Sequence, residues 1–145
     1  MSVFSSMNIS ASGMTAQRLR TDIIAQNIAN VNTTRTKDGT PYVRQTVVFA
    51  EKGVSPFSNA YANAVGFSGT GVKVSNIIED TKTSMKKVFD PSHPDADEEG
   101  YVTYPNINSV TEMTNLIDAS RAYEANVTAF NATKAMALKG LEVGK

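Results

Sequence analysis

Residues 112–141, EMTNLIDASRAYEANVTAFNATKAMALKGL, carry the pattern that decides the fold. Mostly apolar side chains recur here at alternating steps of three and four residues, which is the spacing of a coiled-coil seam. The seam runs through Met113, Leu116, Ser120, Tyr123, Val127, Phe130, Lys134, Ala137 and Leu141. This spacing predicts one long helix that begins near Asn108 and ends near Leu141.

A second stripe on the same predicted helix carries only small side chains. It consists of Ala122, Ala125, Ala129 and Ala132, and it lies about 140–150° from the seam at about 100° per residue. One interpretation is that alanine simply favours helix. The other is that neighbours enclose the helix on two sides. At 1.5 Å per residue the helix would be about 50 Å long, more than a compact chain of this size covers. We therefore expect other chains to supply the missing neighbours.

The N-terminal segment, residues 1–32, is predicted to form a second helix. Its apolar stripe has the spacing seven, three and four, through Ile9, Ala16, Leu19 and Ile23. The same stripe continues to two amides, Asn27 and Asn30, and we expect the helix to end near Asn30 to Asn32. A polar amide on a packed face usually trades stability for alignment. We therefore predict that Asn27 and Asn30 set the register between subunits.

The middle segment, 33–106, is predicted to be β-rich and irregular. A turn at Asp38-Gly39 precedes the strand-like run 42–49, and residues 72–80 alternate in the same way. Shorter strands are expected near 85–90 and 101–104. A flexible loop is expected at about 53–71, where Gly, Ser, Asn and Ala dominate. The predicted fold is α+β, in which the helices of residues 1–32 and 107–145 pair as an antiparallel, coiled-coil-like hairpin.

The composition excludes several classes of protein. The 145 residues include 14 basic and 14 acidic side chains, so the net charge gives no support for nucleic-acid binding. The absence of Cys excludes disulfides and zinc sites with thiolate ligands. No run approaches the about 18 apolar residues of a transmembrane helix. The first residues, MSVFSSMNISASGM, lack the basic and apolar regions of a secretory signal peptide.

The one histidine, His93, lies in the acidic segment 90–99, DPSHPDADEE. Histidine and carboxylates serve as metal ligands and as general acids and bases, so a metal-dependent enzyme is one alternative function. Against it, the prolines predict an exposed turn, and the calcium-loop pattern would need a glutamate at Asn106. The glycines of 66–73, GFSGTGVK, lack the ending of a phosphate-binding loop. We expect no catalytic residue, metal, cofactor or small-molecule substrate.

Two terminal segments resemble a known family, the bacterial flagellar rod proteins. The first is 10–34, SASGMTAQRLRTDIIAQNIANVNTT, where a helix ends in an N-[IL]-A-N-x-[ND]-[ST] element before a strand. The second is 110–144, which contains the family's closing core at Glu112, Met113, Leu116, Ile117, Ser120, Arg121, Tyr123, Ala125 and Asn126. The short chain is most similar to the proximal rod members.

The resemblance implies a structural subunit of the basal body that transmits motor torque across the periplasm. It implies export through the flagellar type III apparatus without a cleaved signal, and helical polymerisation. The implied partners are other rod proteins, copies of the same chain and an export-gate adaptor, with no membrane insertion. A cytoplasmic coiled-coil adaptor is the other alternative. The expected assembly interface comprises Ile9, Ala16, Leu19, Ile23, Asn27, Asn30, Met113, Leu116, Tyr123, Ala125, Asn126, Val127, Ala129, Phe130 and Leu141.

Overall fold

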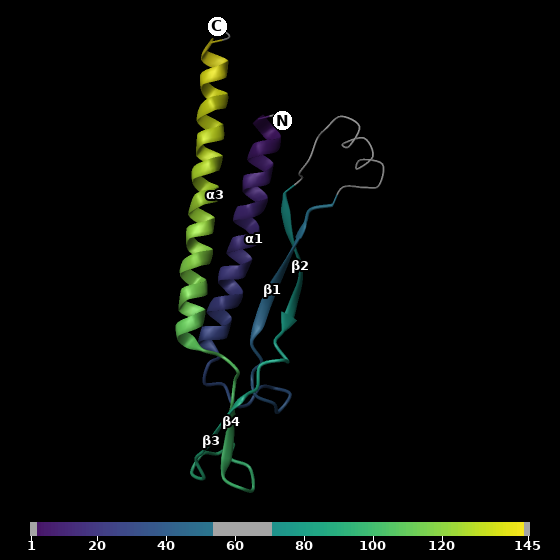
Figure 1. The fold of residues 1–145 in the computed structure, drawn as a ribbon, viewed down its shortest axis with the longest axis vertical. Helices are drawn as coiled ribbons and strands as arrows, with labels where there is room; N and C mark the ends of the chain where they lie inside the picture. The colour runs from purple at the N-terminus through teal and green to yellow at the C-terminus, as the bar shows by residue number, and fades with distance from the viewer. Residues whose placement is uncertain (1–2, 54–70, 144–145) are drawn as a thin grey trace.

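The computed structural model describes residues 3–53 and 71–143, and it has a helix at each end of the chain and strands between them (Figure 1). The element order is α1 (Val3–Ala29), β1 (Gln45–Glu51), β2 (Val72–Glu79), β3 (Lys86–Phe89), β4 (Tyr101–Tyr104) and α3 (Ser109–Val143). The predicted loop at 53–71 lies almost wholly outside the described residues. The predicted α+β class, with a terminal helix hairpin and a small strand-containing middle, is confirmed.

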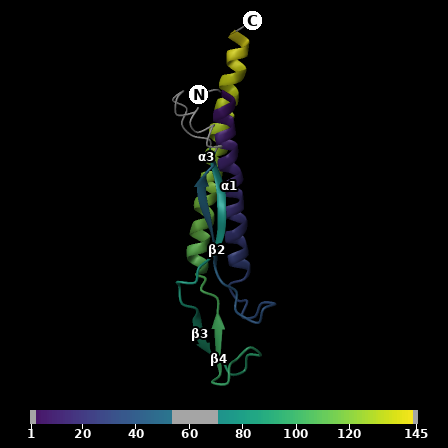
Figure 2. The ribbon, with the colours of Figure 1, turned by 90° about the vertical axis from the view of Figure 1, so that its right-hand side faces the viewer.

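The two helices lie side by side and run in opposite directions (Figures 1 and 2). Gly13 of α1 lies against Asn126 of α3, and Asn27 of α1 binds Glu112 of α3. Gly13 and Asn27 are fourteen residues apart on α1, and their partners Asn126 and Glu112 are fourteen apart on α3. The alignment of the two helices therefore stays constant between these contacts. Over its described residues, neither helix is long and apolar enough to cross a membrane.

The strands form two separate antiparallel pairs. β1 pairs with β2, with an irregularity between Val48 and Phe49, and this pair lies alongside α1. β3 pairs with β4 beyond the end of the helix hairpin where α3 begins (Figure 1). A two-stranded sheet is only marginally stable alone, so the β1–β2 pair depends on the helix that it covers.

Side-chain caps define where the helices stop and start. After α1 ends at Ala29, Asn30 Nδ2 donates to the Gln26 carbonyl and its Oδ1 accepts from Thr33, which closes the last turn. Asn108 precedes α3, and its Oδ1 accepts hydrogen bonds from the backbone N–H groups of Val110 and Thr111. This is the usual arrangement of an N-cap asparagine.

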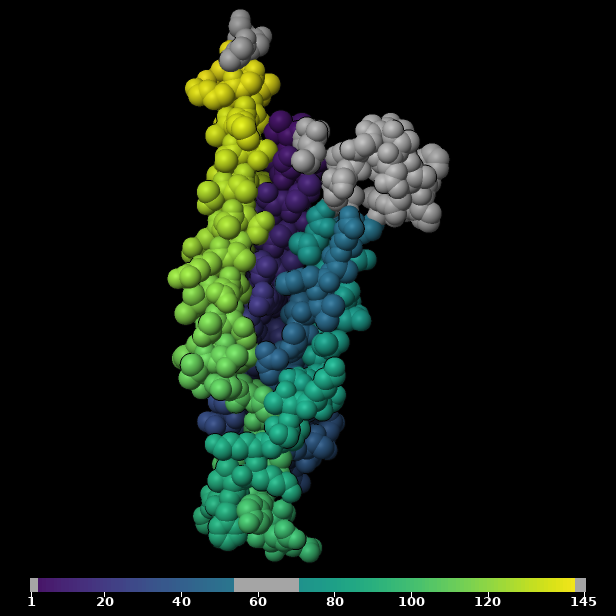
Figure 3. All heavy atoms as spheres, in the orientation of Figure 1, coloured from purple at the N-terminus to yellow at the C-terminus, as the bar shows by residue number. Residues whose placement is uncertain are grey.

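The apolar core of the described residues is small. Its buried apolar side chains are Ala16, Ile23, Ile24, Val102 and Ala119. The chain exposes 10081 Å², whereas a compact monomer of 15.6 kDa exposes about 7,000 Å². Large apolar side chains remain exposed on both helices and along the strands, and the C-terminal end of α3 projects beyond α1 (Figure 3). An elongated chain with so little core has surface that a partner could cover.

Candidate assembly site

Asn27 is the centre of a polar junction between α1, β1 and α3. Its side chain is 0% exposed. Nδ2 donates to the Gln45 carbonyl at 2.8 Å and to Glu112 Oε2 at 3.1 Å. Oδ1 accepts from the Gln45 N–H at 2.9 Å and from the Tyr42 hydroxyl at 3.2 Å. An amide has two donor hydrogens and two acceptor lone pairs, so every hydrogen-bonding position of Asn27 is filled.

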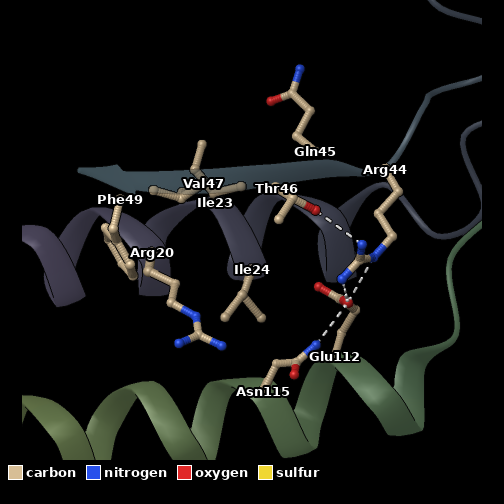
Figure 4. A pocket seen from close by; sticks show the side chains of 10 residues that line it. All are labelled: Arg20, Ile23, Ile24, Arg44, Gln45, Thr46, Val47, Phe49, Glu112 and Asn115. Atoms are coloured by element: carbon tan, nitrogen blue, oxygen red, sulfur yellow. Dashed lines mark hydrogen bonds and ion pairs between the residues drawn. The ribbon is translucent and has the colours of Figure 1, made fainter. Parts of the chain in front are cut away.

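Glu112 carries the buried charge of this junction, at 1% exposure. Its Oε1 accepts from Arg44 Nε at 3.0 Å and Nη2 at 2.9 Å, and from Asn115 at 3.2 Å (Figure 4). The Arg44 Nη1 atom also donates to the Thr46 hydroxyl at 3.0 Å. Burying a carboxylate is costly unless it is paired and hydrogen-bonded, and here both oxygens are satisfied.

The junction extends from Arg44 to the base of the β3–β4 pair. The Arg44 N–H donates to Asn106 Oδ1, and Asn106 Nδ2 donates to the carbonyls of Asp80 and Thr83. Hydrogen bonds from Thr83, and more weakly the charge of Arg44, lower the pKa of the Asp80 carboxyl below its ordinary 3.8. Desolvation, then the charges of Glu79 and Glu112, raise the pKa of the Tyr42 hydroxyl above 10.0. Tyr42 therefore stays a neutral hydrogen-bond donor.

Asn27 and Asn30, which the sequence predicts to set the register between subunits, both have partners inside the single chain. Asn27 has no hydrogen-bonding position left for a neighbouring chain, and Asn30 is used in closing the end of α1. The alignment that Asn27 sets is that of α1 with β1 and α3 inside one chain. The sequence pattern put both amides on a packed face, but it did not identify the partner on that face.

The α1 residues of the expected interface lie mainly against α3 and the strands. Ala16 and Ile23 are buried, and Ile9 and Leu19 are half-buried. Gly13 brings the helices closest, because a Cβ at this position would lie 2.5 Å from Asn126 Oδ1.

The buried stripe of α3 is displaced by one position from the predicted seam. Its contact with α1 runs through Glu112, Ala119, Asn126 and Thr133, seven residues apart, and Glu112, Ala119 and Thr133 are buried. Three of these four side chains are polar, so hydrophobic periodicity alone does not find the stripe. Of the seam residues, Leu116, Val127, Phe130 and Ala137 are half-buried beside it.

The remaining α3 residues of the expected interface are exposed in the single chain. Met113 is 56% exposed, Tyr123 39% and Leu141 72%, and Ala125 and Ala129 are also exposed. These side chains are therefore available to a neighbouring chain.

A groove opens between β1 and α3, next to the junction (Figure 4). Its volume is about 300 Å³, and apolar side chains from α1 and β1 line it: Ile23, Ile24, Val47 and Phe49. Arg20 of α1 extends toward α3 in this groove (Figure 4). Among the described residues, its guanidinium has no hydrogen bond or ion pair.

In the acidic segment 90–99, Asp90, His93 and Asp97 stabilise their own turn, whereas the Asp95 carboxylate accepts from the Thr34 hydroxyl at 2.8 Å and pairs with Arg35. Asp90 Oδ1 accepts from the N–H and hydroxyl of Ser92, and Asp97 Oδ1 accepts from the N–H groups of Glu99 and Tyr101. His93 Nδ1 accepts from the Asp95 N–H at 3.1 Å. This pattern is typical of turns capped by aspartate.

Comparison with known proteins identifies the family. The family described as "Flagella basal body rod protein" matches residues 7–37, and "Flagellar basal body rod FlgEFG protein C-terminal" matches residues 98–143. A "Flagellar basal-body rod protein FlgC" from Bacillus subtilis (strain 168) is 48% identical over 100% of both chains. The chain belongs to the flagellar basal-body rod proteins. Proteins of the same name from Borreliella burgdorferi and Escherichia coli O157:H7 are 45% and 39% identical, over 99% and 100% of this chain and 98% and 100% of theirs.

The resemblance seen in the two terminal segments is thus confirmed, and the chain is a structural protein of the flagellar basal-body rod. Sequence reasoning missed Arg44, Gly13 and the pairing of Asn27 with Glu112. One feature of the sequence pointed to Glu112. An acidic residue is common in the first turn of a long helix, but one that lies on the buried face of the helix needs a partner.

Proposed function

We propose that the chain is a torque-bearing subunit that polymerises helically with other rod proteins and with copies of itself. It acts mechanically and not as an enzyme, after export through the flagellar apparatus, and it contacts an export-gate adaptor at the base of the rod. The observation that supports this proposal is the large exposed apolar surface of α3 beside a very small core. Covering that surface would stabilise the assembled chain, so folding of the helix ends is coupled to assembly.

The small-residue stripe of α3 is the surface where a neighbouring helix would approach closely. Ala125, Ala129 and Ala132 are exposed and short, so a second helix could pack there with its backbone near. The half-buried Ala122 continues this stripe toward α1. The remaining interface residues, Met113, Tyr123 and Leu141, would be covered by the same neighbours.

Replacing Ala129 with glutamate tests the proposal. Ala129 is exposed in the single chain, so Ala129→Glu should leave its fold intact but should place a charge in a close helix contact. We expect at least a tenfold loss of the chain from isolated basal bodies, because a desolvated, unpaired carboxylate costs more than about 1.4 kcal/mol. The control is Thr40→Glu, which adds the same charge to an exposed turn. Equal incorporation of both variants would contradict the proposal.

A further inference from the structure

We propose that the groove between β1 and α3 receives the C-terminal end of α3 from a second copy of this chain. This inference rests on the proposed function, because it specifies one contact within the proposed polymer. Two features carry it: the end of α3, which the described residues leave uncovered, and Arg20, which no described residue pairs in a groove with one apolar wall.

The first feature is the part of α3 that extends past α1. Because the register is constant, Val3, the first described residue of α1, lies opposite Met136. The last turns of α3 therefore continue beyond the described part of α1, as Figures 1 and 3 show. Met136 is 65% exposed, Leu138 53% and Leu141 72%. This end of α3 presents apolar side chains that the described part of the chain leaves uncovered.

The second feature is the composition of the groove. Ile24, Val47 and Phe49 supply apolar surface to it, and its volume of about 300 Å³ lies at the lower end of the range for ligand pockets. Outside this apolar wall the lining is polar, and its other two charges, Arg44 and Glu112, pair with each other. Arg20 therefore adds a positive charge that no described residue neutralises. An occupant that fits would combine leucine-sized side chains with a carboxylate.

The end of α3 has that combination. Leu138 and Leu141 are followed by Glu142, whose carboxylate binds Lys139 at 2.6 Å. Both of these charged side chains are largely exposed, at 79% and 64%, so their pairing contributes little and can be exchanged. In the groove, Leu138 and Leu141 would contact the apolar wall, and Glu142 would pair with Arg20.

A chain cannot fill its own groove in this way. Asn115 lines the groove and Leu138 lies on the same helix, about 35 Å further along at 1.5 Å per residue. The occupant must therefore come from another chain. The end and the groove are different surfaces, so the contact joins copies head to tail and does not close as a two-fold dimer. Such contacts extend a helical polymer.

A charge exchange tests the proposed contact in the organism that encodes the chain. Arg20→Glu and Glu142→Arg should each lower the amount of chain in isolated basal bodies at least about tenfold, because each places like charges together. The double variant should recover to within about threefold of the wild-type amount. The matched control is Arg18→Glu, an exposed arginine on α1 outside the groove lining, which should incorporate normally.

Cysteine cross-linking distinguishes this contact from other modes of assembly. The natural chain has no cysteine, so Val47→Cys paired with Leu141→Cys gives an unambiguous product. Cells that express both variants should yield a disulfide-linked dimer of this chain, and either variant alone should not. Normal basal bodies without this dimer, or a Leu141→Cys adduct with a different rod protein, would overturn the inference but leave the proposed function intact. Absence of the unaltered chain from basal bodies would contradict the proposed function itself.

Discussion

The Asn27 amide donates a 3.1 Å hydrogen bond to the buried carboxylate of Glu112, across 85 residues of sequence. Through Gln45 and Arg44, the same two side chains also hold β1 and the base of the β3–β4 pair. The end of the helix hairpin is thus joined to the strand-rich middle by polar contacts in addition to the apolar packing of α1 on the strands. A connection of this kind is specific in geometry, because a shift of one helical turn would leave several buried groups unsatisfied.

Glu112→Gln should destabilise the chain by about 2–4 kcal/mol, although the substitution hardly changes the shape of the side chain. The neutral amide would place its NH₂ group against either the Arg44 guanidinium or the Asn27 NH₂, so one donor pair would clash. Urea unfolding followed by circular dichroism measures this loss. Glu124→Gln, on the exposed surface of the same helix, is the control and should change stability by less than about 0.5 kcal/mol.

A double variant identifies the cause of this loss. Arg44→Met alone leaves Glu112 buried without its cation and should cost about 3–5 kcal/mol. Combined with Glu112→Gln, it should cost clearly less than the two single changes added together. Strictly additive losses would show that the ion pair is not the source of the coupling.

Gly13→Ala should displace the amide end of the Asn126 side chain and destabilise the hairpin by about 1 kcal/mol or less, because the gain in helix propensity offsets part of the loss. The added Cβ would lie 2.5 Å from Asn126 Oδ1 and 2.9 Å from its Cγ. Shortening the neighbour with Asn126→Ala should restore most of the stability, as measured by thermal unfolding.

Gly140 offers the matched control for this substitution. A Cβ at Gly140 meets nothing within 4 Å, and the residue lies in the exposed end of α3. Gly140→Ala should therefore stabilise the helix slightly, by up to about 1 kcal/mol, through helix propensity alone. A similar loss from both substitutions would contradict the close approach at Gly13.

Acid should destabilise the chain partly through Asp80. Its pKa is lower in the folded chain than the ordinary 3.8, chiefly because of the hydrogen bonds from Thr83. The unfolded chain therefore binds the proton first, and stability falls as pH drops below about 3.8 toward the lowered folded value. The free energy of unfolding of Asp80→Asn should depend less on pH. Plotted against pH, the curves of the unaltered chain and of the variant should therefore converge as pH falls. Parallel curves in urea titrations would remove Asp80 from the acid response.

Hydrogen exchange should be uneven along α3 in the unassembled chain. Amides near Glu112 lie beside the buried junction and should exchange slowly, whereas the last turns, with Leu138 and Leu141 exposed, should exchange fastest. On incorporation into the rod, the protection of these last turns should rise at least about tenfold. Uniform protection of α3 before assembly would contradict coupled folding of the helix end.

The sequence of this protein was enough to predict two terminal helices, short strands between them and membership of the rod family. The helices and strands could be predicted because they depend on local features, and the family because two terminal segments resemble its members. A period of 3.6 residues, β-branched alternation and turn residues act within a few positions of each other. The positions of α1, β1, β2 and α3 accordingly match the predicted segments closely.

Which residues meet across those segments follows from the packing of the folded chain. The α3 stripe that contacts α1 contains Glu112, Asn126 and Thr133, and polar side chains give no hydrophobic signal. Asn27 was correctly expected on a packed face, but its four hydrogen bonds go to three residues distant in sequence: Tyr42, Gln45 of β1 and Glu112 at the start of α3. Their convergence depends on the antiparallel docking of helices that are 85 residues apart at this point, and such a long-range contact follows from packing and not from local periodicity.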